Sequence, residues 1–120
     1  MGKPNNTGIT RIINALGFSK QGLQAAWMNE AAFRQELILA VILFPLAFFV
    51  GKSNIEIAIL VMTLFIVVIA EIINSALEAV VDRISDEQHE LAGRAKDMGS
   101  AAVFLALMMT AIVWLIILFN

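Results

Sequence analysis

The sequence predicts an all-α integral membrane protein that has an N-terminal amphipathic surface helix and three transmembrane helices. Hydrophobic residues make up 60% of its 120 residues and charged residues only 15%, whereas about a quarter of a soluble domain is charged. The apolar residues also fall into three long runs. Lipid is therefore the expected solvent. Residues 1–120 are predicted to form a single membrane domain. No nucleic acid partner is expected at a net charge of -2.

The N-terminal segment, residues 1–28, is predicted to lie in the headgroup plane as an amphipathic helix. Its apolar residues recur at helical spacing, at Ile9, Ile12, Ile13 and Leu16. Gly17 is expected to end this helix. A second short apolar face follows, and Trp27 is expected to mark the membrane interface.

The three predicted membrane-spanning helices cover approximately residues 30–50, 55–81 and 98–119. A spanning helix needs about 20 mostly apolar residues, which the second and third runs easily supply. Pro45 interrupts the first run, but neighbouring helices make proline tolerable in a membrane helix. Residues 51–54 are predicted to form a tight polar turn. Residues 82–97 are predicted to form a longer charged loop.

The positions of Lys and Arg predict the orientation of these spans. Seven of the eight basic residues lie before Leu37, where the continuous apolar part of the first run begins, or between the second and third runs, and Lys52 alone lies on the other side. Because cytoplasmic segments are enriched in Lys and Arg, the N-terminus is expected in the cytoplasm and the C-terminus in the periplasm.

The second run carries an unusual polar stripe. At 100° per residue its polar side chains fall within an arc of about 100°; they are Glu71, Asn74, Ser75, Glu78 and Asp82. Glu71 is expected about 24 Å from the outer end of the helix, which is close to the cytoplasmic interface. A carboxylate there costs a few kcal/mol unless it is paired, coordinated or protonated. The stripe is therefore either a helix–helix contact or a functional site.

Further charged residues are expected at the same membrane level. Glu30 begins the first run, and Lys96 with Asp97 lies at the end of the predicted loop. Carboxylates that meet basic residues at one interface suit Mg²⁺ and phosphate, because Mg²⁺ takes one or two carboxylates together with phosphate oxygens. A solvated headgroup face remains an equal alternative for Glu30 and Glu36. His89 is expected to be a loop residue. The sequence contains no phosphate-binding P-loop motif.

Three blocks of the sequence resemble the signature motifs of the prokaryotic diacylglycerol kinases, which are small three-span enzymes of the bacterial inner membrane. The blocks are NEAAFRQE (29–36), EIINSALEAVVDR (71–83) and HELAGRAKDMGSAA (89–102). The resemblance implies a homotrimer whose active sites are shared between neighbouring subunits. With Mg²⁺, it would transfer the γ-phosphate of ATP to the primary hydroxyl of the membrane lipid diacylglycerol. Undecaprenol is the alternative lipid alcohol, and GRAKDMGSAA favours diacylglycerol.

The resemblance also implies roles for individual residues. Glu71 would be the general base, Asn74 would help to position the reacting groups, and Glu30 and Glu78 would hold Mg²⁺. Phe18 stands where the familiar enzymes carry Tyr, so ring stacking could survive there but a hydroxyl contact could not. The expected nucleotide contacts are Arg11, Phe18, Glu30, Glu78, Glu87, Gln88, His89, Lys96 and Asp97. The expected lipid contacts are Ala15, Lys20, Gln24, Ala25, Ala26, Trp27, Ala32, Phe33, Arg34, Gln35, Glu36 and Ser100.

Two functions of other classes are compatible with a small helical membrane protein. A transporter that exchanges protons or cations at an intramembrane Glu would place that residue near the middle of the membrane, whereas Glu71 is expected near the interface. A purely structural oligomer could be held together by small residues such as Ser75 and Gly99. That interpretation explains packing but leaves the acidic stripe unexplained.

Overall fold

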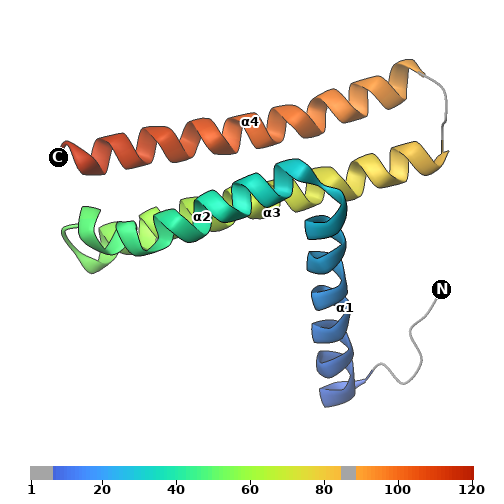
Figure 1. Cartoon of the computed structure of the whole chain (residues 1–120), viewed down its shortest axis with the longest axis horizontal. Helices are drawn as coiled ribbons and strands as arrows, with labels where there is room; N and C mark the ends of the chain where they lie inside the picture. The colour runs from blue at the N-terminus through green and yellow to red at the C-terminus, as the bar shows by residue number, and fades with distance from the viewer. Residues whose placement is uncertain (1–6, 85–88) are drawn as a thin grey trace.

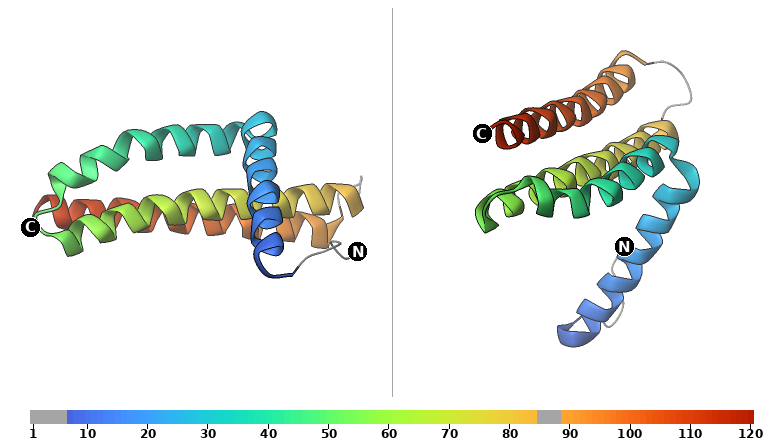
Figure 2. Two further views of the ribbon diagram at one scale, coloured as in Figure 1. Left: turned by 90° about the horizontal axis from the view of Figure 1, so that it is seen from below. Right: turned by 60° about the vertical axis from the view of Figure 1, so that its left-hand side comes forward.

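The protein is a bundle of helices in the computed structural model, which describes residues 7–84 and 89–120. The helices are α1 (Gly8–Asn29), α2 (Ala31–Val50), α3 (Asn54–Ile84) and α4 (Glu90–Leu118). α3 packs against both α2 and α4, and these three helices run alongside one another. α1 leaves the bundle crosswise (Figures 1 and 2).

Three of these helices, α2, α3 and α4, are long and apolar enough to cross a membrane. The predicted all-helical fold with three long apolar helices is therefore confirmed. Pro45 lies inside α2 without ending it, as expected for a helix whose neighbours compensate for the missing hydrogen bond.

The prediction that the first helix ends at Gly17 is wrong, because α1 continues through Gly17 and Gly22 to Asn29. A glycine weakens a helix by about 1 kcal/mol relative to alanine, but it does not oblige the chain to leave the helix. Neither glycine has a positive φ angle. α1 ends instead at Glu30, whose backbone is extended with φ -120° and ψ 107°.

The predicted charged loop over residues 82–97 is also largely wrong. α3 continues to Ile84, and α4 already begins at Glu90, eight residues before the predicted third span. Two local interactions stabilise this helix start. Nδ1 of His89 accepts a hydrogen bond from the backbone N–H of Leu91 at 3.1 Å, and Arg94 pairs with Glu90 at 3.2 Å. Lys96 is therefore a helical residue.

The turn between α2 and α3 is as tight as predicted. A Cβ atom at Gly51 would lie 2.6 Å from Cγ1 of Ile57, so a larger residue would not fit. Ser53 caps α3, since its Oγ accepts the N–H of Glu56 at 3.2 Å. The Glu56 carboxylate in turn accepts the N–H of Lys52 at 2.8 Å. This arrangement resembles a capping box.

Polar contacts tie α4 to the rest of the bundle. Nε1 of Trp114 donates to Oγ1 of Thr63 at 3.0 Å, and Thr110 donates to the backbone oxygens of Ala106 and Thr63 at 2.8 and 3.4 Å. At the C-terminal end of α4, Nζ of Lys52 donates to the carbonyl of Ile117 at 2.7 Å. These contacts set the register of α4 on α3. A small apolar core lies at the same end, formed by Ala47, Leu60 and Ile117.

Candidate active site

The polar stripe of α3 faces the bundle, as its periodicity predicts. Glu71 is only 5% exposed and Ser75 is also buried. Asn74 and Glu78 are partly buried, and Asp82 is exposed. Burial therefore decreases along the stripe from Glu71 toward the end of α3. A ligand that approaches from that end would meet the exposed carboxylate first and Glu71 last.

Carboxylates from three elements gather around Glu71. Besides its burial, Glu71 is influenced by the negative charges of Glu36, Glu78 and Glu30. Glu36 lies in α2, Glu78 lies two turns further along α3, and Glu30 lies between α1 and α2. Within residues 7–84 and 89–120, no three His, Cys, Asp or Glu side chains are close enough to hold a metal ion by themselves.

The donor set still suits Mg²⁺, because this ion usually takes one or two carboxylates and completes its shell with water and phosphate oxygens. The Glu71 carboxyl group is buried, and Glu36, Glu78 and Glu30 lie near enough to add to the negative potential there, which a cation would relieve. The residues present therefore fit a nucleotide-bound Mg²⁺ better than a metal held by protein ligands alone.

Glu30 is positioned by the elbow between α1 and α2. Its N–H donates to the carbonyl of Ala26 at 2.9 Å and so closes α1. Nη1 of Arg34 reaches back to the carbonyl of Trp27 at 2.7 Å. Phe33 is 1% exposed and anchors the elbow from inside. The extended residue at the elbow thus turns the chain and brings a carboxylate to the level of Glu71.

Asn74 lies against α4. Its Oδ1 is buried and has no hydrogen-bond partner in the part of the chain that the structure describes. The Asn74 side chain lies against Gly99 of α4, which has no side chain to keep the two helices apart. Ser100, the next residue, is exposed.

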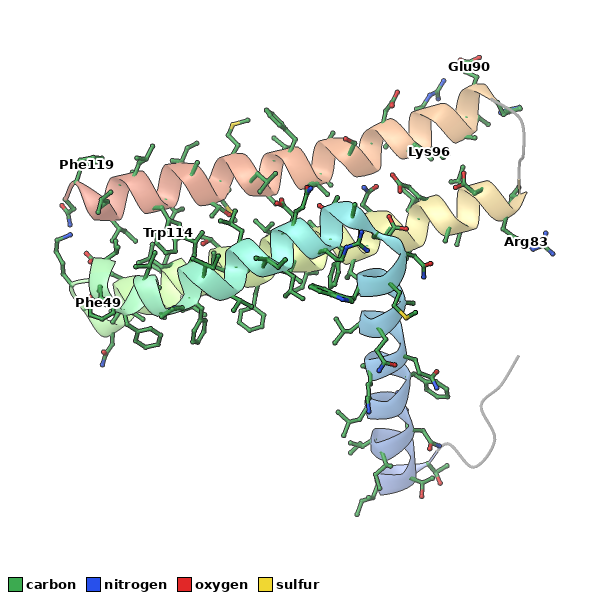
Figure 3. The ribbon with its side chains drawn as sticks, in the orientation of Figure 1. Phe49, Arg83, Glu90, Lys96, Trp114 and Phe119 are labelled. Carbon is green, nitrogen blue, oxygen red and sulfur yellow. The ribbon has the colours of Figure 1, made fainter. Side chains whose placement is uncertain are left out.

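Lys96 projects from α4 toward the end of α3, where its Nζ lies 2.6 Å from Oδ1 of Asp82 (Figure 3). Asp97 is exposed. His89 is also exposed and lies outside the helices, as predicted for a loop residue, and its side chain caps α4. Glu87 and Gln88 lie outside the described residues. Of the expected nucleotide contacts, Glu78 and Lys96 thus lie on neighbouring helices that border the same end of the bundle.

The expected nucleotide contacts on α1 are remote from this cluster within one chain. Arg11 and Phe18 precede Glu30 by nineteen and twelve residues. Along a helix these separations are about 28 and 18 Å. Since α1 leads away from the bundle (Figure 1), the fold does not bring Arg11 to Glu71 of the same chain.

The expected lipid contacts lie on α1, at the start of α2 and on α4. Ala26 and Phe33 are buried at the elbow, so they support the surface that the others present. Arg34 and Glu36 are partly buried. The exposed members are Ala15, Lys20, Gln24, Ala25, Trp27, Ala32, Gln35 and Ser100.

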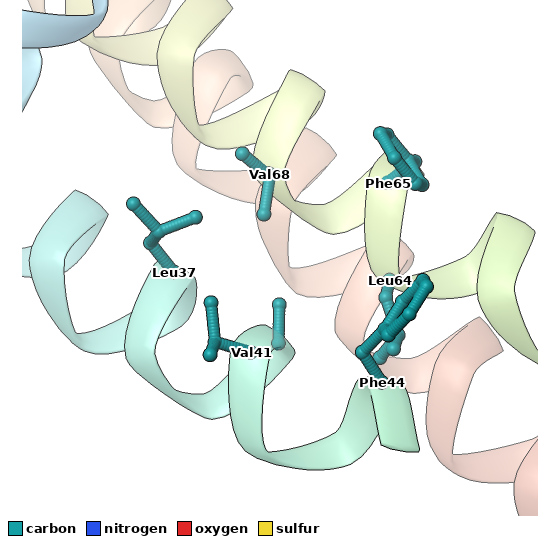
Figure 4. Close-up of a pocket in the computed structure, with 7 residues that line it drawn as sticks. Leu37, Val41, Phe44, Leu64, Phe65 and Val68 are labelled. Carbon is teal, nitrogen blue, oxygen red and sulfur yellow. The ribbon is translucent and has the colours of Figure 1, made fainter. Parts of the chain in front are cut away.

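An apolar groove of about 250 Å³ lies between α2 and α3 and was not predicted from the sequence (Figure 4). Its first lining residue on α2 is Leu37, which follows Glu36 in the sequence, and residues at helical spacing form both walls. Its lining residues are Leu37, Ala40, Val41, Phe44, Leu64, Phe65 and Val68. The four residues on α2 follow the i, i+3, i+4, i+7 pattern of one helix face, but the pattern alone does not reveal that α3 leaves this face partly uncovered.

Comparison with known proteins identifies the family. The profile of the prokaryotic diacylglycerol kinases matches residues 17–118. The chain belongs to the prokaryotic diacylglycerol kinase family. This confirms the resemblance carried by the three sequence blocks.

Individual members of the prokaryotic diacylglycerol kinase family are similar over almost their whole length. The diacylglycerol kinase of Haemophilus influenzae is 54% identical over 113 residues, which are 94% of this chain and 96% of the relative. That of Escherichia coli K12 is 52% identical over 97% of this chain and 95% of its own. The diacylglycerol kinase of Pseudomonas aeruginosa is 48% identical over 93% of this chain and 91% of its own length.

Proposed function

We propose that the chain transfers the γ-phosphate of ATP to the primary hydroxyl of diacylglycerol and so forms phosphatidic acid. The observation that carries this proposal is the buried Glu71 amid three further carboxylates, in a chain whose relatives are named diacylglycerol kinases. The site lies at the end of the bundle where the exposed Asp82 and Lys96 meet. A membrane-dissolved alcohol and a nucleotide in the aqueous phase can both reach such a position.

Glu71 acts as the general base. Its carboxylate accepts the proton of the lipid hydroxyl while the hydroxyl oxygen forms a bond to the γ-phosphorus. The bond between that phosphorus and the β–γ bridging oxygen breaks, and ADP leaves. Asn74 lies one turn away on the same face and positions the reacting groups. Phosphoryl transfer depends mainly on such positioning and on charge neutralisation.

Glu30 and Glu78 would hold Mg²⁺, and phosphate oxygens of the nucleotide would complete its shell of oxygen ligands. When bound, the ion neutralises the charge that develops on the phosphates. Lys96 contributes a further positive charge, and Asp97 with His89 faces the nucleoside. Glu78→Gln is expected to weaken Mg²⁺-dependent nucleotide binding, which calorimetry with and without Mg²⁺ measures in the absence of turnover. Unchanged Mg²⁺ dependence would contradict the ligand role of Glu78.

The lipid enters from the side of α2. The groove between α2 and α3 is apolar throughout and starts one residue beyond Glu36, which acts on Glu71 electrostatically. An acyl chain in this groove would leave the glycerol hydroxyl near the carboxylates. Of the predicted lipid contacts, those from Ala32 to Glu36 directly precede the groove along α2.

The active site is shared between the subunits of a homotrimer. Arg11 lies too far along α1 to reach Glu71 of its own chain, so a contact between Arg11 and ATP requires another copy of the chain. α1 then lies on the cytoplasmic surface of the inner membrane with its exposed Ile9, Ile12 and Leu16 in the lipid. The N-terminus is cytoplasmic and the C-terminus periplasmic. Mixed oligomers of inactive Arg11 and Glu71 variants should regain activity, and none would be regained if each site were built from one chain.

The deciding experiment measures the transfer of labelled γ-phosphate from Mg-ATP in mixed micelles that contain either diacylglycerol or undecaprenol. Label in phosphatidic acid supports the proposal. Label only in the polyprenyl product assigns undecaprenol as the substrate. Absence of label in both lipids, from folded protein, would refute kinase activity and favour a transporter.

A further inference from the structure

Gly99 lies on α4 where α3 and α4 come closer than a side chain at that position would allow. A Cβ atom at position 99 would overlap Oδ1 of Asn74 and would lie 3.2 Å from its Cγ and 3.1 Å from Cδ2 of Leu77. The amide of Asn74 therefore occupies the space that a side chain on α4 would fill.

This position does not need glycine for its backbone. Gly99 is in the interior of a regular helix and does not have a positive φ angle. Glycine destabilises a helix interior by about 1 kcal/mol relative to alanine, so the benefit of Gly99 lies in the space it leaves. Gly93, six residues earlier in α4, differs in this respect because a Cβ atom there would have no neighbour within 4 Å.

Packing is what holds the Asn74 oxygen in place. Oδ1 is buried, and no hydrogen bond within residues 7–84 and 89–120 fixes it. Asn74 lies three residues after Glu71 and four before Glu78, so the three side chains share one face of α3. The shape of α4 at Gly99 thus determines where the amide sits relative to both carboxylates.

We propose that Gly99 is a positioning residue for phosphoryl transfer, because the notch it leaves in α4 holds the amide of Asn74 beside Glu71 and Glu78. The inference rests on the role given to Asn74 under the proposed function. A methyl group at position 99 must either rotate the amide or push α3 and α4 apart.

The effect of Gly99→Ala should appear in kcat. A misplacement of about 1 Å can lower a rate by about 10²-fold, so kcat is expected to fall roughly 10- to 100-fold. The KM values for Mg-ATP and for diacylglycerol should stay within about threefold, because their other contacts remain. Gly93→Ala is the matched control, since it makes the same substitution in the same helix without a neighbour. It should leave kcat unchanged.

The experiment compares kcat and KM of the full-length variants in mixed micelles, per mole of folded protein, together with their thermal stability. A fall in kcat that is specific to Gly99→Ala supports the proposal. A purely structural role would lower thermal stability but leave kcat per folded molecule unchanged, and that result would overturn the proposal.

A double variant tests whether Gly99 acts through Asn74, and it does not depend on the folding of Gly99→Ala alone. Asn74→Ser shortens the side chain and leaves room for a methyl group. In that background Gly99→Ala should lower kcat less than twofold further, whereas a further loss of tenfold or more would overturn the proposal. Full activity in Asn74→Ser would refute the role of Asn74 and the inference with it. Normal kcat in Gly99→Ala, with loss in Asn74→Ser, would refute the role of Gly99 alone.

Discussion

The hydrogen bond between Trp114 and Thr63 is expected to hold α4 in register on α3. It is 3.0 Å long and involves a threonine that is 3% exposed. The Thr63 hydroxyl also donates to the carbonyl of Leu60 at 2.6 Å. Removing the indole N–H of Trp114 therefore leaves the Thr63 oxygen without one of its donors, but it leaves no buried N–H or O–H group unpaired. Trp114→Phe should therefore lose one ordinary hydrogen bond, about 0.5–1.5 kcal/mol, together with the dispersion contacts of the larger ring.

Thr63→Val removes the same hydrogen bond from the other side. Valine has nearly the same shape as threonine, but the indole N–H of Trp114 is left without its acceptor. The unfolding free energy is therefore expected to fall by about 1–3 kcal/mol. Interhelical hydrogen bonds in membranes contribute about 0.6 kcal/mol on average and up to about 1.7. The loss of unfolding free energy in the double variant should therefore be about 1 kcal/mol smaller than the sum of the losses in the two single variants.

The assay is reversible unfolding by SDS in mixed micelles, followed by near-ultraviolet circular dichroism. Trp27→Phe is the control, because Trp27 is 42% exposed on α1 and should change the unfolding free energy little. Strictly additive losses in the double variant would refute the reasoning, since they would mean that Trp114 and Thr63 stabilise the fold independently.

Three further predictions concern the site and the opposite end of the bundle. Glu71→Gln should lower kcat by about 10²-fold or more while the KM for Mg-ATP changes little in steady-state assays; normal turnover would exclude it as the base. Asp82→Asn should free Lys96 for phosphate and lower the KM for Mg-ATP roughly two- to fivefold at unchanged kcat, since an exposed ion pair is weak; a higher KM would instead mean that Asp82 orients Lys96. Lys52→Met should remove the hydrogen bond to Ile117 and speed amide exchange in the last turn of α4 roughly fivefold; unchanged exchange would show that Lys52 does not hold that end.

The three long apolar helices and the polar stripe of α3 could be predicted from the sequence alone. Both depend on properties of a single segment. In lipid a helix must satisfy its own backbone hydrogen bonds, so a long apolar run suffices to predict a span. The 3.6-residue period likewise places Glu71, Asn74 and Glu78 on one face before any partner is known.

The ends of the helices were less predictable from residue type. Gly17 was expected to end α1, but α1 continues to the elbow at Glu30. Residues 82–97 were expected to form a loop because they are charged, yet Lys, Arg and Glu are good helix formers. His89 provides the cap that starts α4, a role that follows from its backbone geometry.

Which residues of different helices meet could not be predicted from the sequence and is seen only in the folded chain. The contacts of Gly99 with Asn74 and of Lys96 with Asp82 join segments whose relative register no local pattern contains. That register results from packing and from a few polar contacts between α3 and α4, such as Trp114 with Thr63. The groove between α2 and α3 arises in the same way, because the space between two helices depends on how the side chains of both interlock.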